Sequence, residues 1–394
     1  MDELHNPFTP GAGTPPPELA GRKEIIDQAT ILLKRIQLGR AAKSLLITGL
    51  RGVGKTVLLN EMHRIAKQIG YQNILTEAHE DKPLPALLVP ELRNLLYKLD
   101  RMEGAKERVR RGLAVLAGFV RSIKVTYEDI PFGLDIEPER GTADSGDLET
   151  DLPYLFTVVG EAAASRKTSV LLLIDELQYL SEKELSSLIM AIHKIQQEQL
   201  PIALIGAGLP ILPRLAAESK SYAERLFDFP QVGSLNSEDA AIAIREPIEE
   251  EGESITAKAV DMIVNMTQGY PYFIQAWAYQ VWNHAKQSPI GPEVVNAASE
   301  PTRSQLDENF FKVRFDRLNN SEKYFLRAMA EIGPGPHKMG DVANVMGLKV
   351  KSLSPRRSKL INKGMIYSPQ HSEIAFTVPL FDEFMRRTMP EFEK

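Results

Sequence analysis

The order of hydrophobic and polar positions predicts an alternation of strands and helices over the first 230 or so residues. Apolar residues recur at the spacing of amphipathic helices over residues 23–38, 56–68, 152–164 and 182–197. Short, largely apolar runs that are typical of buried strands fall at residues 44–48, 73–78, 169–174, 201–206 and 227–232. Because strands that alternate with helices form parallel sheets covered on both faces, we predict an α/β fold with a doubly wound parallel sheet.

Two regions depart from this alternation. Residues 83–151 predict two helices, a hairpin-like segment (IKVTYEDIPFGLDIEPE) and a polar loop (RGTADSGDLET), which we interpret as an insertion of unassigned role. After residue 232 the spacing is helical throughout, with helices expected near residues 237–251, 257–267, 271–286 and 305–318. We therefore predict that an all-helical lid follows the parallel-sheet core.

The two ends of the chain have patterns of their own. The first 20 residues hold five prolines, which favour an extended arm over a helix. From residue 319 onward, three helical segments, two short strands and a closing helix (PLFDEFMRR) describe a winged helix-turn-helix. The expected domains are an arm at 1–20, a core at 21–232, a lid at 233–318 and a winged helix domain at 319–394.

Composition narrows the classes of function. The chain has 394 residues, 43% of them hydrophobic and 25% charged, which is ordinary for a globular protein. There is no cysteine, so disulfide scaffolds and thiolate metal sites are excluded. The net charge of −5 gives no overall preference for nucleic acid. We see no signal pattern and no long apolar run, so we expect no membrane partner and a cytoplasmic location.

The strongest motif lies between the first predicted strand and the helix after it. Residues 49–56 read GLRGVGKT, which matches the phosphate-binding pattern G-x-x-x-x-G-K-[ST]. Glycines let backbone N–H groups point at phosphate oxygens, the lysine reaches the β- and γ-phosphates, and the threonine hydroxyl ligates Mg²⁺. A chance match in a glycine-rich turn is the alternative, which the flanking strand and helix disfavour. The predicted nucleotide contacts are Gly49, Leu50, Arg51, Gly52, Val53, Gly54, Lys55, Thr56 and Val57.

An acidic pair follows the apolar run at 169–174. Asp175, at the end of a strand close to the phosphate loop, can hold Mg²⁺ together with Thr56, and Glu176 can orient and polarise the attacking water. We therefore predict catalytic roles for Glu176 and Lys55. The alternative is that the two acidic residues only mark the place where a strand ends at the solvent-exposed surface. This is the more common explanation of such a pair in a sequence without a phosphate loop.

In this order the motifs resemble those of AAA+-related ATPases, in particular the branch that holds origin-recognition initiators and the STAND signalling ATPases. The resemblance implies an ATPase that binds ATP or ADP with Mg²⁺. Residues 18–23 (ELAGRK) are similar to a box that helps to house adenine, which implies a contact from Arg22. The segment Gly269-Tyr270-Pro271 is similar to a lid motif in which Pro271 lies against the nucleotide. A proline in a first helical turn also has a purely structural explanation.

Two further positions can be compared with those of the AAA+-related ATPases, and both concern the hydrolysis of ATP. The predicted strand at 201–206 leads into Gly206-Ala207-Gly208, where related ATPases carry a polar sensor of the γ-phosphate. We therefore expect either slow hydrolysis or a γ-phosphate that is sensed by another group. Arg225 stands where relatives carry an arginine finger that acts on a neighbouring subunit, which implies a nucleotide-dependent homo-oligomer. The alternative for Arg225 is an ion pair with Glu224 or Asp228.

Charge is segregated toward the C-terminal segment. Residues 319–394 carry 12 Lys/Arg against 8 Asp/Glu, a net +4. Between residues 342 and 372 there is no acidic residue, while six bases lie on or near the third helix. They could contact the phosphates and base edges of double-stranded DNA, and they are Lys349, Lys351, Arg356, Arg357, Lys359 and Lys363. Winged helices also serve as docking or autoinhibitory modules.

The sequence therefore predicts an ATP-binding switch that hydrolyses ATP with Mg²⁺ and is coupled to DNA through its winged helix. The first alternative is a STAND-type signalling ATPase whose winged helix mediates autoinhibition or protein contacts. The second is a nucleotide-binding module that never hydrolyses ATP, which the glycines at the sensor position favour.

Overall fold

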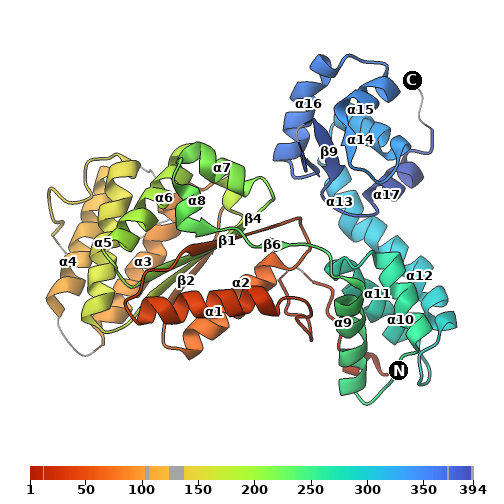
Figure 1. Ribbon diagram of the computed structural model, residues 1–394, viewed down its shortest axis with the longest axis horizontal. Coiled ribbons are helices and arrows are strands. Elements are labelled where there is room, and N and C mark those ends of the chain that lie inside the picture. Colours follow the sequence, from red (N-terminus) through yellow and green to blue (C-terminus); the bar gives the residue numbers. More distant parts are fainter. Residues whose placement is uncertain (12, 103–105, 124–136, 371, 392–394) are drawn as a thin grey trace. The chain divides into compact units, whose positions relative to one another are not determined.

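The computed structural model describes residues 1–11, 13–102, 106–123, 137–370 and 372–391 (Figure 1). Its internal contacts divide the chain into two compact units. We call them the sheet unit, Arg22–Gly49 with Lys55–Val232, and the helical unit, Met1–Gly21, Leu50–Gly54 and Gly233–Lys394. Each is described by itself, and the domain limits expected from the sequence stay predictions.

A parallel sheet forms the centre of the sheet unit. Its strands are β1 (Ser44–Gly49), β2 (Gln72–Glu77), β3 (Val170–Asp175), β4 (Ile202–Gly208), β5 (Phe227–Asp228) and β6 (Gln231–Val232). The order is β2-β3-β4-β1-β5, with β6 also paired to β1, and every pairing is parallel. All residues of β1, β3 and β4 are buried, as the apolar runs require. The predicted α/β fold is confirmed.

Helices lie on both sides of this sheet (Figure 1). They are α1 (Lys23–Gln37), α2 (Lys55–Gln68), α5 (Leu148–Ser165), α6 (Glu182–Gln197), α7 (Leu212–Ser219) and α8 (Ala223–Leu226). The four helices predicted from apolar spacing are present, with bounds that differ by at most four residues. The short helices α7 and α8 were not predicted, because eight and four residues are too few to establish a helical period.

The region interpreted as an insertion contributes two helices to the same hydrophobic core. These are α3 (Leu84–Asp100) and α4 (Lys106–Ser122), as expected. Their apolar residues join one cluster with those of α5 and the sheet, including Leu88, Leu116 and Leu172. The predicted hairpin lies mostly outside the described residues, since 124–136 are not part of them.

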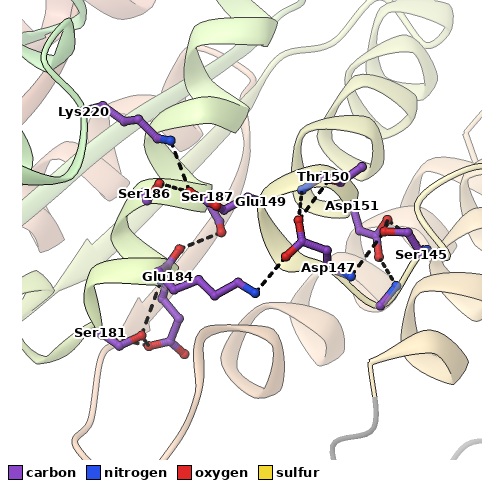
Figure 2. A network of polar contacts seen from close by, with 12 residues as sticks. Ser145, Asp147, Glu149, Thr150, Asp151, Ser181, Glu184, Ser186, Ser187 and Lys220 are labelled. Atoms are coloured by element: carbon purple, nitrogen blue, oxygen red, sulfur yellow. Dashed lines mark hydrogen bonds and ion pairs between the residues drawn. The ribbon is translucent and has the colours of Figure 1, made fainter.

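A polar network fixes the first turn of α5 (Figure 2). The buried Asp151 carboxylate accepts hydrogen bonds from the backbone N–H groups of Ser145 (3.1 Å) and Gly146 (2.8 Å). Asp147 forms an ion pair of 2.7 Å with Lys183 of α6. Because a buried carboxylate is tolerated only when it is satisfied, the loop before α5 is held in one conformation, and the helix begins four residues earlier than expected.

The α-helices of the helical unit lie after residue 233. Its helices are α9 (Ser237–Glu250), α10 (Ala257–Thr267), α11 (Pro271–His284), α12 (Pro292–Leu306), a π-helical turn (Asp307–Phe311) and α13 (Lys312–Phe315). Helix α12 was not predicted, because Pro301 and several polar residues interrupt its apolar spacing. Three aromatic side chains of α11, those of Phe273, Trp277 and Trp282, are buried in the core.

The first residues of the chain pack along α11. Asn6 donates a 3.0 Å hydrogen bond to the carbonyl of Tyr279, and the indole of Trp282 donates a 2.9 Å bond to the carbonyl of Asp2. Phe8 is fully buried. A single short 3₁₀ turn, Glu3–His5, interrupts the irregular backbone of the described part of this segment. These contacts attach the arm to α11.

The C-terminal part of the helical unit has the element order of a winged helix. It comprises α14 (Asn320–Ile332), β7 (His337–Lys338), α15 (Met339–Met346), α16 (Val350–Asn362), β8 (Ile366–Tyr367), β9 (Glu373–Phe376) and α17 (Phe381–Thr388). The strands form an antiparallel sheet in the order β7-β9-β8. This arrangement is compatible with the predicted winged helix, and β7 is a strand that the sequence did not predict.

A buried carboxylate ties α14 to α16. Glu322, only 2% exposed, forms a capping box with Asn319 and accepts a 2.7 Å hydrogen bond from the ammonium of Lys363. Burial by itself would raise the pKa of Glu322, but the bonds from Lys363 and from the backbone outweigh it, so the pKa lies below the ordinary value of 4.5. The ionised form of Glu322 therefore stabilises the fold.

We expect Glu322→Gln to lower the free energy of unfolding by about 1–2 kcal/mol at neutral pH, since the charge-assisted bond from Lys363 is lost, while an amide oxygen can keep the capping box. Because the folded-state pKa of Glu322 is depressed, the stabilisation is present above pH 4.5 and is lost as the pH falls through the folded value. The difference between wild type and variant should therefore shrink in acid.

Urea unfolding between pH 3 and pH 7 measures this difference. Glu383→Gln is the matched control, because Glu383 is 47% exposed and lies 3.7 Å from its partner Arg387, so its loss should cost less than about 0.5 kcal/mol. A Glu322→Gln variant as stable as wild type at pH 7 contradicts this role of the carboxylate.

Candidate nucleotide-binding site

The glycine-rich motif forms the connection between β1 and α2. β1 ends at Gly49 and α2 begins at Lys55. Gly52 and Gly54 have φ angles of 77° and 95°, a region of backbone conformation that favours glycine. The N-terminus of α2 and the backbone N–H groups before it therefore provide the setting in which phosphate groups bind to proteins. Lys55, which is 5% exposed, occupies the first position of the helix.

Thr56 and Asp175 are brought into direct contact. The Thr56 hydroxyl, in the first turn of α2, donates a 2.5 Å hydrogen bond to Oδ2 of Asp175, the last residue of β3. Asp175 is 6% exposed, and burial raises the pKa of its carboxyl, while the bond from Thr56 and the charge of Lys55 lower it. A hydroxyl and a carboxylate oxygen are hard ligands of the kind that Mg²⁺ prefers, so the donor set fits this ion.

Glu176 follows directly and has an unusual backbone. Its φ and ψ angles are 54° and 38°, in the left-handed region, and its N–H donates a 2.8 Å bond to Oδ1 of Asp175. The Glu176 carboxylate accepts a hydrogen bond from the side-chain amide of Gln178. Sequence reasoning missed Gln178, although an amide two residues after an acidic pair was a visible signal.

The end of β4 is closely packed, which explains its glycines. A Cβ atom on Gly206 would lie 2.2 Å from Cδ1 of Leu177, and one on Gly208 would lie 2.8 Å from Oε1 of Gln178. Because real Cβ contacts are never that short, a side chain at either position would force its neighbours to move. The glycines at the expected sensor position are therefore compatible with the close packing of Leu177 and Gln178, the residues that follow Glu176.

In the helical unit, Tyr270 lies close to the phosphate loop. A Cβ added to Gly52 would be 2.7 Å from the Tyr270 hydroxyl, and burial raises the pKa of that hydroxyl above its ordinary value. Gly269 has a φ of 68°, and a Cβ there would lie 2.2 Å from the carbonyl oxygen of Leu235. Pro271 is the first residue of α11, the position at which proline is favoured.

The two arginines expected at the site have different surroundings. Arg22 is buried and immediately precedes α1. Arg225 lies on α8 and is exposed, and no ion pair of Arg225 is found in the described part of the chain. Asp228, one of its two alternative partners, forms an ion pair of 3.2 Å with Lys43 instead.

The six bases assigned to DNA contacts divide into two groups. Lys349, Lys351 and Lys359 are exposed on or next to α16, and Arg356 is half-buried. Arg357 donates a 2.9 Å bond to the hydroxyl of Ser368, and Lys363 forms the ion pair with Glu322. Those two bases therefore serve the fold of the domain, which leaves a smaller set for a ligand.

Known proteins resemble this chain in the region that forms the site. Residues 18–205 match the family of AAA ATPase domains. The chain carries an AAA ATPase domain. The resemblance to AAA+-related ATPases that the motifs predicted is thereby confirmed. A second family, a domain of unknown function (DUF8462), matches residues 308–385.

A curated relative matches part of the chain. The origin recognition complex subunit 4 of Rattus norvegicus is 26% identical to this chain over 228 residues. The match covers 55% of this chain and 44% of that protein, so the chain spans less than half of the length of this relative.

One solved structure shares the fold of this chain, and two others are similar to it with lower scores. The Walker-type ATPase paby2304 of Pyrococcus abyssi superposes with a TM-score of 0.61 at 14% identity, covering 95% of this chain and 97% of the other. The RuvB Holliday junction branch migration motor of Thermotoga maritima reaches 0.44 at 16% identity, covering 95% and 96%. The Orc1 protein of Aeropyrum pernix in complex with DNA reaches 0.42 at 15% identity, covering 94% of each chain.

Among the described residues, no helix has the length and apolar character that a membrane crossing requires.

Proposed function

We propose that this protein is a slow, Mg²⁺-dependent ATPase whose nucleotide state controls binding of double-stranded DNA by its C-terminal domain. The observation that carries the ATPase proposal is the 2.5 Å hydrogen bond between Thr56 and Asp175, next to Lys55 at the start of α2. The bond brings a hydroxyl and a carboxylate oxygen together beside the N-terminus of α2, which supports binding of a metal-bound triphosphate there.

Each residue of the site has a distinct role in the proposed reaction. The loop N–H groups and Lys55 bind the β- and γ-phosphates, and Thr56 and Asp175 hold the metal. When bound, Mg²⁺ supplies positive charge to the phosphate oxygens. Glu176 orients a water molecule and takes its proton as the water oxygen attaches to the γ-phosphorus and the bond to ADP breaks.

We also propose that Arg225 acts on the nucleotide of a neighbouring copy of the chain. Its exposure on α8 supports this, because a guanidinium that serves another subunit has to be accessible. The expected consequence is an oligomer that forms with ATP and completes the active site.

We expect Lys55→Ala to abolish ATP binding and Glu176→Gln to keep ATP affinity within about twofold while it reduces turnover by about 100-fold or more. The reason is that Lys55 contacts the phosphates in the ground state, whereas Glu176 acts in the transition state. Calorimetric titration of ATP and a phosphate-release assay measure the two effects.

Glu224→Gln is the control, because Glu224 is exposed on α8 and its loss should leave both quantities unchanged. Normal ATP affinity in Lys55→Ala would remove the basis of the proposal. Wild-type turnover in Glu176→Gln would exclude Glu176 as the residue that activates water.

The DNA part of the proposal rests on charge and exposure. The domain that contains α16 carries a net +4, and three exposed lysines lie on or beside that helix. The name of the curated relative, a subunit of an origin recognition complex, agrees with a DNA-associated role. Exposed lysines bind phosphates of any sequence and release counterions, which makes affinity depend on salt.

We expect Lys349→Glu combined with Lys351→Glu to weaken binding of random-sequence duplex DNA and to lower the salt dependence of the affinity by about two phosphate contacts. Fluorescence anisotropy across a series of salt concentrations measures both. The control combines Lys258→Glu with Lys286→Glu, since both lysines are exposed outside the C-terminal domain and give the same change in net charge. Equal loss of affinity in the two double variants would contradict a contact through α16.

A second candidate function is favoured by the contacts of Arg357 and Lys363. Both bases form contacts inside the domain. Fewer positive charges are therefore left on its surface for DNA than its net charge suggests. If the wild type does not bind DNA even at low salt, we propose a STAND-type signalling ATPase whose C-terminal domain makes autoinhibitory or protein contacts. Such a protein would copurify with ADP.

A further inference from the structure

Gln178 links the ends of two neighbouring strands. Its side-chain amide N–H donates to the carboxylate of Glu176, which follows β3. Its side-chain oxygen accepts a 3.0 Å hydrogen bond from the N–H of Leu209, which follows β4. Both functional groups of one amide are therefore used, one on the residue proposed to activate water and one on the backbone.

The space at the end of β4 is filled by the two residues that follow Glu176. Leu177 fills the space above Gly206, and the Gln178 oxygen lies 2.8 Å from where a Cβ on Gly208 would be. β4 therefore offers no polar side chain of its own at Gly206, Ala207 or Gly208. Within the described residues, the polar group that reaches the end of β4 beside Glu176 comes from the segment after β3.

Two features of Glu176 bear on the placement of its carboxylate. A residue in the left-handed region has an orientation that is disfavoured unless its surroundings hold it. The side chain of Glu176 is half-exposed, so packing alone does not fix its carboxylate. The hydrogen bond from Gln178 gives that carboxylate a defined place relative to β3 and β4.

We propose that Gln178 is a positioning residue that holds the Glu176 carboxylate at the end of β4 for ATP hydrolysis, in place of a polar residue on β4 itself. This inference rests on the proposed function, because it assigns a partner to the residue that activates water. Gln178 contacts the reacting groups only through Glu176. Its loss should therefore slow turnover without weakening nucleotide binding.

The first test compares kcat and KM of the full chain with those of Gln178→Met, which keeps the length of the side chain and removes its amide. We expect kcat to fall on the order of 10- to 100-fold and KM for ATP to change by less than about twofold, because supporting residues affect the geometry of the catalytic group. Gln196→Met is the matched control, because the side-chain amide of Gln196 makes two hydrogen bonds as well. It donates to the backbone carbonyls of Ala42 (3.2 Å) and Leu226 (3.5 Å), away from Glu176.

The second test asks whether Gln178 acts through Glu176. In a Glu176→Gln background, adding Gln178→Met should have no further effect on turnover, because the carboxylate that Gln178 positions is already gone. If the two substitutions reduce turnover multiplicatively, or if Gln178→Met and Gln196→Met have equal effects, the inference is overturned.

Amide hydrogen exchange at Leu209 tests the link without turnover. We expect exchange of this N–H to be about tenfold faster in Gln178→Met than in wild type. It should stay slow in Gln178→Glu, which keeps an acceptor oxygen for Leu209 but places a second carboxylate beside Glu176 and so lowers kcat. Unchanged exchange in Gln178→Met, or wild-type kcat in Gln178→Glu, overturns the inference.

The two proposals fail in different ways. If wild type and Lys55→Ala release phosphate equally slowly, the proposed hydrolysis is wrong, and the role of Gln178 in hydrolysis is wrong with it. Hydrogen exchange at the N–H of Leu209 still reports whether the hydrogen bond from Leu209 to Gln178 is formed. If wild type hydrolyses ATP and Gln178→Met does so equally well, the proposed function stands and this inference alone is overturned.

Discussion

The site depends on one buried contact, the hydrogen bond between Thr56 and Asp175. Neither residue could reach the other without the parallel sheet, because parallel pairing places the carboxyl end of β3 near the helix that follows β1. Burial makes the carboxylate costly, as its raised pKa shows, and the hydroxyl of Thr56 and the charge of Lys55 offset part of that cost. A divalent cation would offset this cost further, so the contact suits a metal-bound nucleotide.

A second constraint is the space at the end of β4. Leu177 and Gln178 occupy it so closely that a side chain at position 206 or 208 would have to displace them. The glycines that stand in place of a polar sensor on β4 therefore fit this packing. The same packing explains why the amide of Gln178 is the group that meets this strand end.

Much of this organisation could be predicted from the sequence. The strands β1, β3 and β4 are largely apolar and buried along their whole length. The phosphate loop is defined by glycines whose conformation other residues do not readily adopt. Contacts between segments that are distant in the chain could not be predicted from the local sequence pattern. Helix α12 was missed because Pro301 interrupts its period, and α3 and α4 were interpreted as an insertion although their apolar residues complete the core.

The number of charged residues in a segment was likewise not enough to predict a binding surface. Six bases without an acidic residue among them suggested one continuous surface, yet Lys363 pairs with Glu322 from α14 and Arg357 bonds Ser368 after β8. A count over one segment cannot detect a partner that the fold brings from another. The exposed lysines around the start of α16 are therefore the part of that prediction that the structure leaves available to a ligand.

The most direct measurement of the central claim is a calorimetric titration of wild-type protein with ATP, once with Mg²⁺ and once with a chelator. If Thr56 and Asp175 hold the metal of a bound nucleotide, ATP should bind at least tenfold more tightly with Mg²⁺ than without it. ATP binding that is absent, or equally tight in the two solutions, would contradict the account.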